Sequence, residues 1–262
     1  MSVMDMFRLD GKVAFLNGAG RGIGAASAIA LGEAGADIAI RARTRSQLDE
    51  VAGRVRELGR RVLVLEATAE PGEDVAALDI IVSELGRLDV LVNVVGGAMP
   101  GPFMKGNGAR LNASFDFNVT GPVRLTRAAV PHMLANGGGA VVNITTVMSQ
   151  LVARGYSEYG TVKAALEHAT RLMAADLSPR IRVNGVAPGA IHTDSLEIIM
   201  RDPSIRAAME AATPMRRIGV PDDIAAAVLY LCSPASAYVT GKIIRVDGGI
   251  QTPNFQMPLP DL

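Results

Sequence analysis

The sequence predicts an α/β fold: a doubly wound, seven-stranded parallel sheet with helices on both faces. Two observations predict it. Seven short runs rich in β-branched residues alternate with longer segments in which apolar residues recur at helical spacing. The short runs are apolar on both faces, as strands are when helices cover both sides of a parallel sheet. With 262 residues, 49% of them hydrophobic, the chain can build one sizeable core.

The elements follow one another in a regular order. Strands are expected at residues 12–17, 37–41, 62–66, 90–93, 140–144, 182–186 and 242–246. Helices are expected at residues 23–33, 45–58, 74–85, 122–135, 159–177 and 222–231. Because a helix lies between each pair of successive strands, the strands are expected to run parallel.

Three segments lie outside these elements. Residues 96–108 are rich in Gly and Pro and are expected to form a loop after the fourth strand. Residues 189–215 are expected to form a substrate lid with a break at Pro203. Residues 251–262 hold three prolines and are expected to form an extended tail, a crossing onto a neighbouring subunit or a disordered end. No stretch has the composition of a linker, so residues 1–262 are expected to form a single domain.

Composition and charge argue against several classes of protein. The 26 basic and 26 acidic side chains balance, so no basic surface indicates a nucleic-acid partner. The lone Cys232 cannot form an internal disulfide, and no two histidines or cysteines have the spacing of metal ligands. The N-terminus does not resemble a signal peptide, and no apolar run approaches the roughly 18–20 residues that span a bilayer. We therefore expect a cytoplasmic protein without a metal or a membrane partner.

A glycine-spaced turn lies between the first strand and the first helix. Its glycines would allow a tight turn, a close approach of the backbone to a pyrophosphate and close packing of the helix on the strand. The helix N-terminus would then present free N–H groups to the phosphates. Residues 17–24 are therefore predicted to bind a dinucleotide through Asn17, Gly18, Gly20, Arg21, Gly22, Ile23 and Gly24.

The tip of the second strand indicates which dinucleotide. A free ribose 2′-hydroxyl usually meets an acidic residue about 20 residues after the glycines. No carboxylate lies there; the small Ala42 leaves room, and Arg43 offers a guanidinium to a 2′-phosphate. Arg21 can add a second positive charge. We predict NADP(H) as the preferred cofactor and NAD(H) as the alternative, in which case these arginines are merely solvated.

Tyr159 and Lys163 stand four residues apart in a predicted helix, so their side chains share a face. An ammonium beside a phenol stabilises the phenolate and is expected to lower the pKa of Tyr159 from about 10. Such a phenol can exchange a proton with an alcohol or a carbonyl oxygen. The pair alone is a weak signal, but its combination with the glycine turn is a strong one.

Over nearly its whole length the chain resembles the short-chain dehydrogenase/reductase family, which has a Rossmann-type fold. The motifs that carry the resemblance are Gly18-x-x-x-Gly22-x-Gly24, Tyr159-x-x-x-Lys163, the segment 188–193 and the segment 240–249. The resemblance implies that Asn118 supports a water relay to the lysine. It also implies that Pro188, Gly189, Ile191 and Thr193 contact the nicotinamide end of the cofactor and close over it.

The chain departs from the family pattern at several positions. Thr146 stands where the family has its active-site serine; it keeps a hydroxyl, and Ser149 is a less favoured substitute that is expected to face the cleft. Asn17 replaces a threonine at the start of the glycine turn. Thr68 replaces an aspartate that holds the adenine. Asn93-Val-Val-Gly96 replaces Asn-Asn-Ala-Gly, and the resemblance implies that Thr68, Asn93 and Gly96 still bind the cofactor.

Together these residues predict hydride transfer between NADP(H) and a secondary alcohol or ketone. The region 118–163 would supply the catalytic residues Asn118, Thr146, Tyr159 and Lys163, with Tyr159 as the general acid/base. The substrate is expected to be hydrophobic and to contact Met99, Met148, Gln150, Tyr156 and His192. The resemblance implies a homotetramer, with a dimer as the alternative. Two other functions stay open: a non-redox lyase or isomerase on the same fold, and a catalytically weak nucleotide-binding scaffold.

Overall fold

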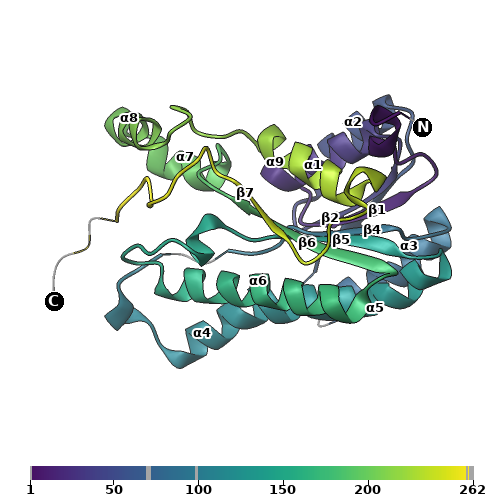
Figure 1. Cartoon of the computed structure of the whole chain (residues 1–262), viewed down its shortest axis with the longest axis horizontal. Helices are drawn as coiled ribbons and strands as arrows, with labels where there is room; N and C mark the ends of the chain where they lie inside the picture. Colours follow the sequence, from purple (N-terminus) through teal and green to yellow (C-terminus); the bar gives the residue numbers. More distant parts are fainter. Residues whose placement is uncertain (1, 69–71, 98–99, 258, 260–262) are drawn as a thin grey trace.

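The computed structural model describes residues 2–68, 72–97, 100–257 and 259. Seven parallel strands form one sheet in the order β3-β2-β1-β4-β5-β6-β7 (Figure 1). The strands are β1 (Val13–Asn17), β2 (Asp37–Ala42), β3 (Val62–Glu66), β4 (Val90–Asn93), β5 (Gly139–Ile144), β6 (Ile181–Pro188) and β7 (Ile243–Val246). The predicted fold class is confirmed, and the strands differ from the expected ranges only by a residue or two at their ends.

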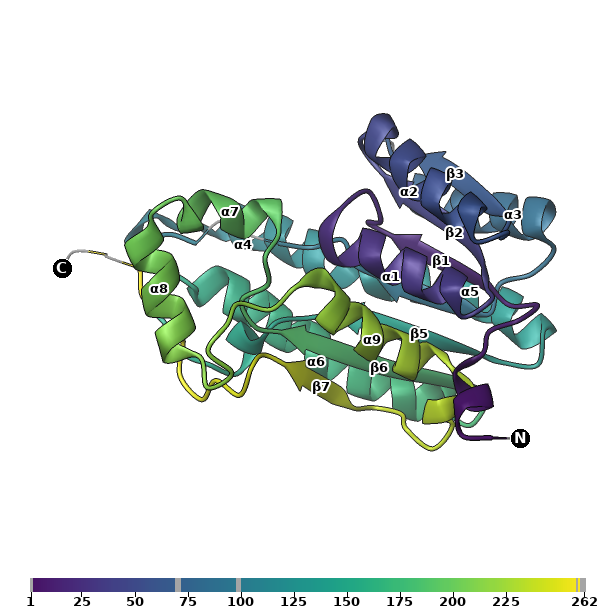
Figure 2. The same cartoon turned by 90° about the horizontal axis from the view of Figure 1, so that it is seen from above.

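Helices cover both faces of the sheet (Figures 1 and 2). One face carries α1 (Gly22–Glu33), α2 (Arg45–Glu57) and α9 (Pro221–Cys232); the other carries α3 (Glu73–Leu85), α5 (Gly121–Ala135) and α6 (Ser157–Leu177). Alternate strand residues supply the two cores, as the pleat requires. In β1, Ala14 and Leu16 pack under α1 and α9, whereas Val13 and Phe15 pack on the α5 side.

The strand order reverses between β1 and β4. Their last residues, Asn17 and Asn93, are partners in the ladder, so the carboxyl ends of the two strands lie side by side. In an open parallel sheet, helices leave neighbouring strands in opposite directions at such a point and open a crevice. This crevice is where the predicted site residues converge.

Besides short 3-10 turns, the prediction did not include α4 (Gly108–Phe115), a π-helical turn (Asp116–Thr120), α7 (Asp194–Met200) and α8 (Pro203–Ala212). The lid is interrupted between Met200, the last residue of α7, and Pro203, the first residue of α8, so the break expected at Pro203 is present. Asp202 caps α8 by accepting from the Ser204 amide at 2.8 Å. Asn107 caps α4 in the same way through the Arg110 amide. Helices α7 and α8 lie together at the end of the molecule from which the tail leaves (Figure 2).

Candidate active site

The glycine turn packs tightly against the ends of the neighbouring strands. Gly18, at φ +106°, donates its amide to the Arg41 carbonyl at 2.7 Å, and a Cβ there would lie 2.9 Å from the Val95 nitrogen. A Cβ on Gly24 would lie 2.1 Å from the Gly18 carbonyl oxygen, so only glycine lets α1 approach the turn this closely. No side chain caps the N-terminus of α1, which leaves its first N–H groups for an anion. These residues fit the pyrophosphate of a dinucleotide.

Two arginines at the end of β2 have different surroundings. Arg41 is buried, and its guanidinium donates to Glu73 Oε2 (2.8 Å) and to Asn17 Oδ1 (3.3 Å). Thr68 donates its amide (2.8 Å) and its hydroxyl (3.0 Å) to the same Glu73 oxygen. Arg43 is exposed and, within the described part of the chain, has no ion-pair partner. The guanidinium available to a ligand at this edge is therefore that of Arg43.

The start of the lid lies against the glycine turn. The Thr193 methyl group would be 3.2 Å from a Cβ built on Gly22, and Arg21 Nη1 pairs with Asp194 Oδ2 at 2.6 Å. Both charged side chains of that pair are more than half exposed, so the pair contributes little stability. Arg21 is thus engaged with the lid, and its predicted role as a second charge for a 2′-phosphate requires it to leave Asp194.

The segment that joins β6 to the lid is held on both sides. Gly189 follows Pro188 at the end of β6, and a Cβ on Gly189 would lie 2.8 Å from the Asp247 Cα. Ile191 is buried and forms a parallel bridge with Gly219. In that bridge the Ala190 carbonyl and the His192 amide bond to the backbone of Gly219. The amide and carbonyl of Ile191 therefore point away from Gly219.

His192 was predicted to contact the substrate. Its Nε2 lies 2.6 Å from Glu197 Oε2 on α7, and both side chains are about half exposed. The imidazole is therefore held by the lid helix. Its predicted contact with the substrate is not supported by this position.

Gly96, Asn118 and Lys163 meet at one point. A Cβ on Gly96 would lie 2.5 Å from Lys163 Nζ and 2.9 Å from Asn118 Oδ1, so no side chain fits there. Asn118, fully buried in the π-helical turn, accepts from the Gly97 amide (2.8 Å) and donates to the Gly97 carbonyl (3.0 Å). Lys163 Nζ donates to the Ile144 carbonyl at 3.0 Å. Asn118 thus orders the loop that covers the lysine.

Tyr159 lies one helical turn before Lys163 on α6. The Thr146 hydroxyl lies near enough to its phenol to lower the Tyr159 pKa by hydrogen bonding, and Tyr156 lies near enough to repel a phenolate. Thr146 itself is 8% exposed and accepts from the Met148 amide at 3.3 Å. The structure therefore brings Tyr159, Thr146 and Lys163 together, as the sequence predicted.

The protonation of this pair differs from the prediction. Burial raises the pKa of Tyr159 to about 12, although its hydrogen bond to Thr146 acts in the opposite direction. Burial lowers the pKa of Lys163 to about 8. Lys163 is directed at the Ile144 carbonyl instead of the phenol. The prediction that Lys163 lowers the pKa of Tyr159 is wrong, because an environment of low polarity favours the neutral form of both groups.

The lowered pKa of Lys163 makes the stability of the fold depend on pH. Below pH 8 the folded protein carries the full cost of a buried ammonium. From pH 8 to about 10.5 only the unfolded chain keeps that proton, so the free energy of unfolding rises with pH, by roughly 3 kcal/mol. Denaturant titrations between pH 7 and pH 10 should show this rise in the wild type and not in Lys163→Met. An equal rise in both proteins would contradict the prediction.

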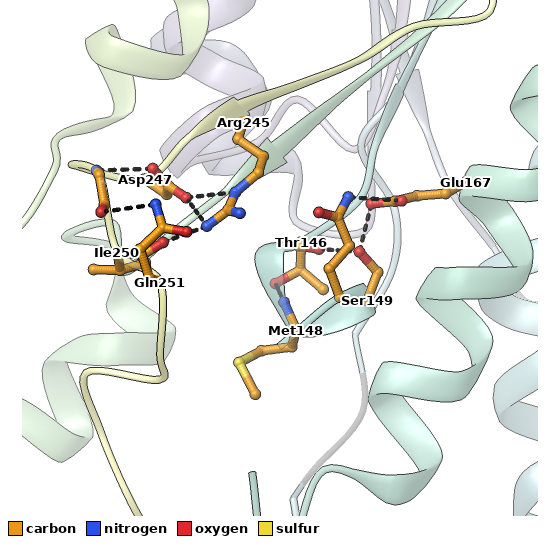
Figure 3. A network of polar contacts seen from close by, with 10 residues as sticks. Thr146, Met148, Ser149, Glu167, Arg245, Asp247, Ile250 and Gln251 are labelled. Carbon is orange, nitrogen blue, oxygen red and sulfur yellow. Dashed lines mark hydrogen bonds and ion pairs between the residues drawn. The ribbon is translucent and has the colours of Figure 1, made fainter. Parts of the chain in front are cut away.

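Two polar residues expected at the substrate wall are hydrogen-bonded to Glu167 of α6, and Figure 3 shows this for Ser149. Gln150 Nε2 donates to Glu167 Oε2 at 3.1 Å, and Ser149 Oγ donates to Glu167 Oε1 and to the Thr146 carbonyl. The Ser149 hydroxyl is thus engaged by the buried Glu167 carboxylate instead of being free at the cleft. Gln150 is exposed, and its contact with the substrate stays a prediction.

The other predicted substrate contacts have mixed outcomes. The Met148 side chain points away from Glu167 (Figure 3), and Tyr156 is partly buried beside Tyr159. Both stay candidates for the substrate wall. Met99 lies outside the described residues.

Asn93 connects elements that carry the site. It is 3% exposed, and its Nδ2 donates to Asn143 Oδ1 at 2.8 Å and to Thr126 Oγ1 at 3.3 Å. Its side chain ties β4 to β5 and α5, and the predicted contact of Asn93 with the cofactor stays a prediction.

Two carboxylates at the site belong to no motif and were missed. Glu73 stands in the first turn of α3, and Glu167 follows Lys163 by four residues on α6. The spacing of Glu167 was a readable signal, since residues four apart share a helix face. No sequence signal pointed to Glu73, because its partner Arg41 lies far from it in the sequence.

Two cavities flank the site without containing it. One of about 430 Å³ lies between the lid and the end of β7 and is lined by Ile191, Thr213, Arg217 and Arg245, among others. The other, of about 500 Å³, lies between residues 101–111 and the first turns of α6. Neither is lined by Thr146, Tyr159 or Lys163. We therefore assign neither cavity to the substrate.

Two features are missing from the part of the chain that the structure describes. No three His, Cys, Asp or Glu side chains there are grouped so as to hold a metal ion. No helix within the described ranges is both long and apolar enough to cross a bilayer.

The geometry places the protein among the oxidoreductases that bind a dinucleotide at the switch point of a doubly wound sheet. Comparison with known proteins makes this assignment specific. Residues 18–251 match the family model described as Enoyl-(Acyl carrier protein) reductase. The chain belongs to the short-chain dehydrogenase/reductase family.

Relatives match almost end to end. An uncharacterized oxidoreductase of Mycobacterium tuberculosis is 51% identical over 99% of this chain and 100% of its own length. A solved structure of a 7 alpha-hydroxysteroid dehydrogenase with NADH and 7-oxo glycochenodeoxycholic acid has a TM-score of 0.91 and 38% identity, covering 97% of this chain and 100% of that one. A solved structure of a gluconate 5-dehydrogenase from Burkholderia cenocepacia with NADP and tartrate has a TM-score of 0.87 and 33% identity. It covers 95% of this chain and 98% of that one.

Proposed function

We propose that the protein transfers a hydride between NADP(H) and a secondary alcohol or ketone with a hydrophobic body. The observation that carries the proposal is that the Tyr159 phenol lies close to the Thr146 hydroxyl, one helical turn from the buried Lys163. The similar structures that hold NADH with 7-oxo glycochenodeoxycholic acid, or NADP with tartrate, support a nicotinamide cofactor, whereas the preference for NADP(H) rests on Arg43. The non-redox lyase or isomerase and the scaffold stay as alternatives that no contact in the site favours.

The chain's own residues have distinct tasks in carbonyl reduction. When bound, the cofactor supplies the hydride. Tyr159 donates its proton to the carbonyl oxygen, and its pKa of about 12 keeps the phenol protonated at neutral pH. The Thr146 hydroxyl donates to the same oxygen and orients it. In alcohol oxidation Tyr159 must first lose its proton, which burial opposes.

Lys163 and Asn118 act around this proton transfer. The Lys163 ammonium donates one hydrogen bond to the Ile144 carbonyl. Its other N–H groups would bind the nicotinamide ribose. Asn118 holds Gly97, and through it the loop beside the ammonium. Proton supply through a water relay from Asn118 to Lys163 stays a prediction.

An apolar substrate fits the surfaces beside Tyr159. Met148 and Tyr156 present apolar groups there, and methionine adapts to irregular shapes. The tail lies near the lid and the segment before α6. Phe255 packs against the buried residues Met200, Met209 and Ile218, and Met257 Sδ would lie 2.9 Å from a Cβ on Gly155. In Figure 1 the tail runs between the lid helices and the α4–α6 side. A moderately large hydrophobic alcohol or ketone is therefore the substrate class we propose.

The proposed reaction is tested with a panel of oxo-steroids, cyclic ketones and polar keto-sugars. The protein is incubated with each carbonyl and NADPH while the nicotinamide absorbance is followed. Oxidation of NADPH with an apolar ketone supports the proposal. Conversion of substrate without a nicotinamide change would support the lyase, and tight NADPH binding without any turnover would support the scaffold.

The cofactor preference depends on Arg43. Removing its guanidinium in Arg43→Ala should lower kcat/KM for NADPH by about 10- to 100-fold, as expected for a charged hydrogen bond to a phosphate, and leave kcat/KM for NADH unchanged. Arg45→Ala is the matched control, because Arg45 is already paired with Asp49 at 3.0 Å. A wild type that favours NADH, or equal losses with both cofactors, would overturn the assignment.

We infer a homotetramer, with a dimer as the alternative. Large apolar side chains are exposed along α4, the π-helical turn, α5 and α6: Leu111, Phe115, Phe117, Leu134 and Leu172. In the family, the helices that correspond to α5 and α6 pack between subunits, which supports the inference. Light scattering should give a mass near four times 27.4 kDa, and a mass of one chain would contradict it. The cytoplasmic location stays a prediction.

A further inference from the structure

A buried carboxylate lies directly behind the catalytic threonine. Glu167 is 3% exposed on α6, four residues after Lys163. Its Oε1 accepts from Thr145 Oγ1 at 3.2 Å and from Ser149 Oγ. Its Oε2 accepts from Gln150 Nε2 at 3.1 Å, with Arg171 Nη2 at 3.5 Å on the outer side. The donors from 145, 149 and 150 all come from one short segment, and that segment contains Thr146.

The segment 145–150 is joined internally as well. Ser149 Oγ also lies 2.6 Å from the Thr146 carbonyl, and the Met148 amide donates to Thr146 Oγ1 at 3.3 Å. Figure 3 shows Ser149 between Thr146 and Glu167. A shift of the carboxylate is therefore transmitted to Thr146 through both the backbone and a side chain.

Burying the Glu167 carboxylate costs free energy, and side-chain packing alone gives no reason for a charge at this position. A buried carboxylate loses its hydration, and an apolar side chain of similar volume would often stabilise a fold as well or better. With an apolar residue at position 167, the side chains at 145, 149 and 150 would also have to be apolar, because their polar groups would lose their partner. The network instead keeps several directional bonds on one loop, and directional bonds restrict position more than apolar packing does.

We propose that Glu167 is a positioning residue that holds the segment 145–150 so that the Thr146 hydroxyl stays beside the Tyr159 phenol, where both can reach one carbonyl oxygen. The inference rests on the proposed function, in which that hydroxyl orients the carbonyl oxygen. Glu167 touches neither the substrate nor the reacting atoms. It acts through Thr146, whose hydroxyl must keep one χ1 rotamer to reach the phenol.

The first test compares kinetic constants of Glu167→Ala, Glu167→Gln and the control Arg171→Ala. Misplacing Thr146 should lower kcat about 10- to 100-fold in Glu167→Ala, with KM and the dissociation constant of NADPH nearly unchanged. Glu167→Gln keeps one acceptor oxygen and should recover part of the loss. Arg171→Ala removes only the outer contact and should behave as the wild type. A wild-type kcat in Glu167→Ala overturns the proposal.

A double-mutant cycle separates positioning from general support of the fold. If Glu167 acts through Thr146, Glu167→Ala should lower kcat no further in a Thr146→Val background. Equal losses in both backgrounds would make Glu167 a structural residue only. Should Glu167→Ala not fold, Ser149→Ala breaks the link from Glu167 to Thr146 and enters the same cycle.

A readout without turnover keeps this inference distinct from the proposed reaction. A crystal structure of Glu167→Gln should show the Thr146 hydroxyl displaced from the Tyr159 phenol. If that hydrogen bond is intact, the positioning role is wrong whatever the activity. If it is broken while the wild-type enzyme reduces no carbonyl of the panel, the positioning role stands and the proposed reaction fails.

Discussion

Replacing Tyr159 by phenylalanine should abolish most of the activity and leave the cofactor site intact. The change removes one oxygen, which is the proton donor in reduction and the partner of Thr146. Loss of a general acid/base group costs about 10²- to 10⁴-fold in rate, and we expect a loss within that range. The measurement is kcat with NADPH and the best ketone of the panel.

Binding data complete this experiment. The dissociation constant of NADPH, measured by fluorescence titration, should stay close to the wild-type value, because the glycine turn and Arg43 are untouched. Tyr156→Phe is the matched control: it removes a phenol one helical turn earlier and should leave kcat nearly unchanged. A Tyr159→Phe variant that keeps its turnover but loses NADPH binding would reverse the roles assigned to these residues.

A second large effect is expected from Gly96→Ala. The new methyl group would lie 2.5 Å from Lys163 Nζ and 2.9 Å from Asn118 Oδ1, closer than these atoms can approach. Lys163 is the flexible partner, so its ammonium should move while the fold persists. We expect kcat/KM to fall about 100-fold or more, the scale of a 1 Å displacement in an active site.

The control for this variant is another glycine of the same loop. Gly101 has no atom within 4 Å of a built Cβ, and its φ lies outside the left-handed region. Gly101→Ala should therefore keep wild-type activity and stability. Circular dichroism distinguishes a moved lysine from an unfolded protein. Full activity in Gly96→Ala would show that the contact among Gly96, Lys163 and Asn118 has no functional weight.

Much of the fold and site could be predicted because the signals are local. Strand and helix periodicity located all seven strands, and the turn from Gly18 to Gly24 located the crevice. The pair Tyr159 and Lys163 was correctly placed on one helix, since residues four apart must share a face. The caps that begin α4 and α8, at Asn107 and Asp202, were equally local and were overlooked.

The predictions that went wrong depend on what surrounds a group. The pKa of Tyr159 follows from burial, and burial is a property of the packed chain. The Ser149 hydroxyl is bonded to a carboxylate that lies 18 residues further along the chain. Arg41 and Arg43 look alike in the sequence, yet only Arg41 meets an acid, supplied by the distant Glu73.

Residue types and their spacing were thus sufficient to identify the family, the dinucleotide turn and the catalytic pair, because each depends on neighbours within a few positions. The direction of the side chains at 149, 150 and 192, the protonation of Tyr159 and Lys163, and the bonds of Glu167 were settled only when distant segments packed together. Electrostatic environment and hydrogen-bond partners are set by distances in space, and those distances exist only in the folded chain.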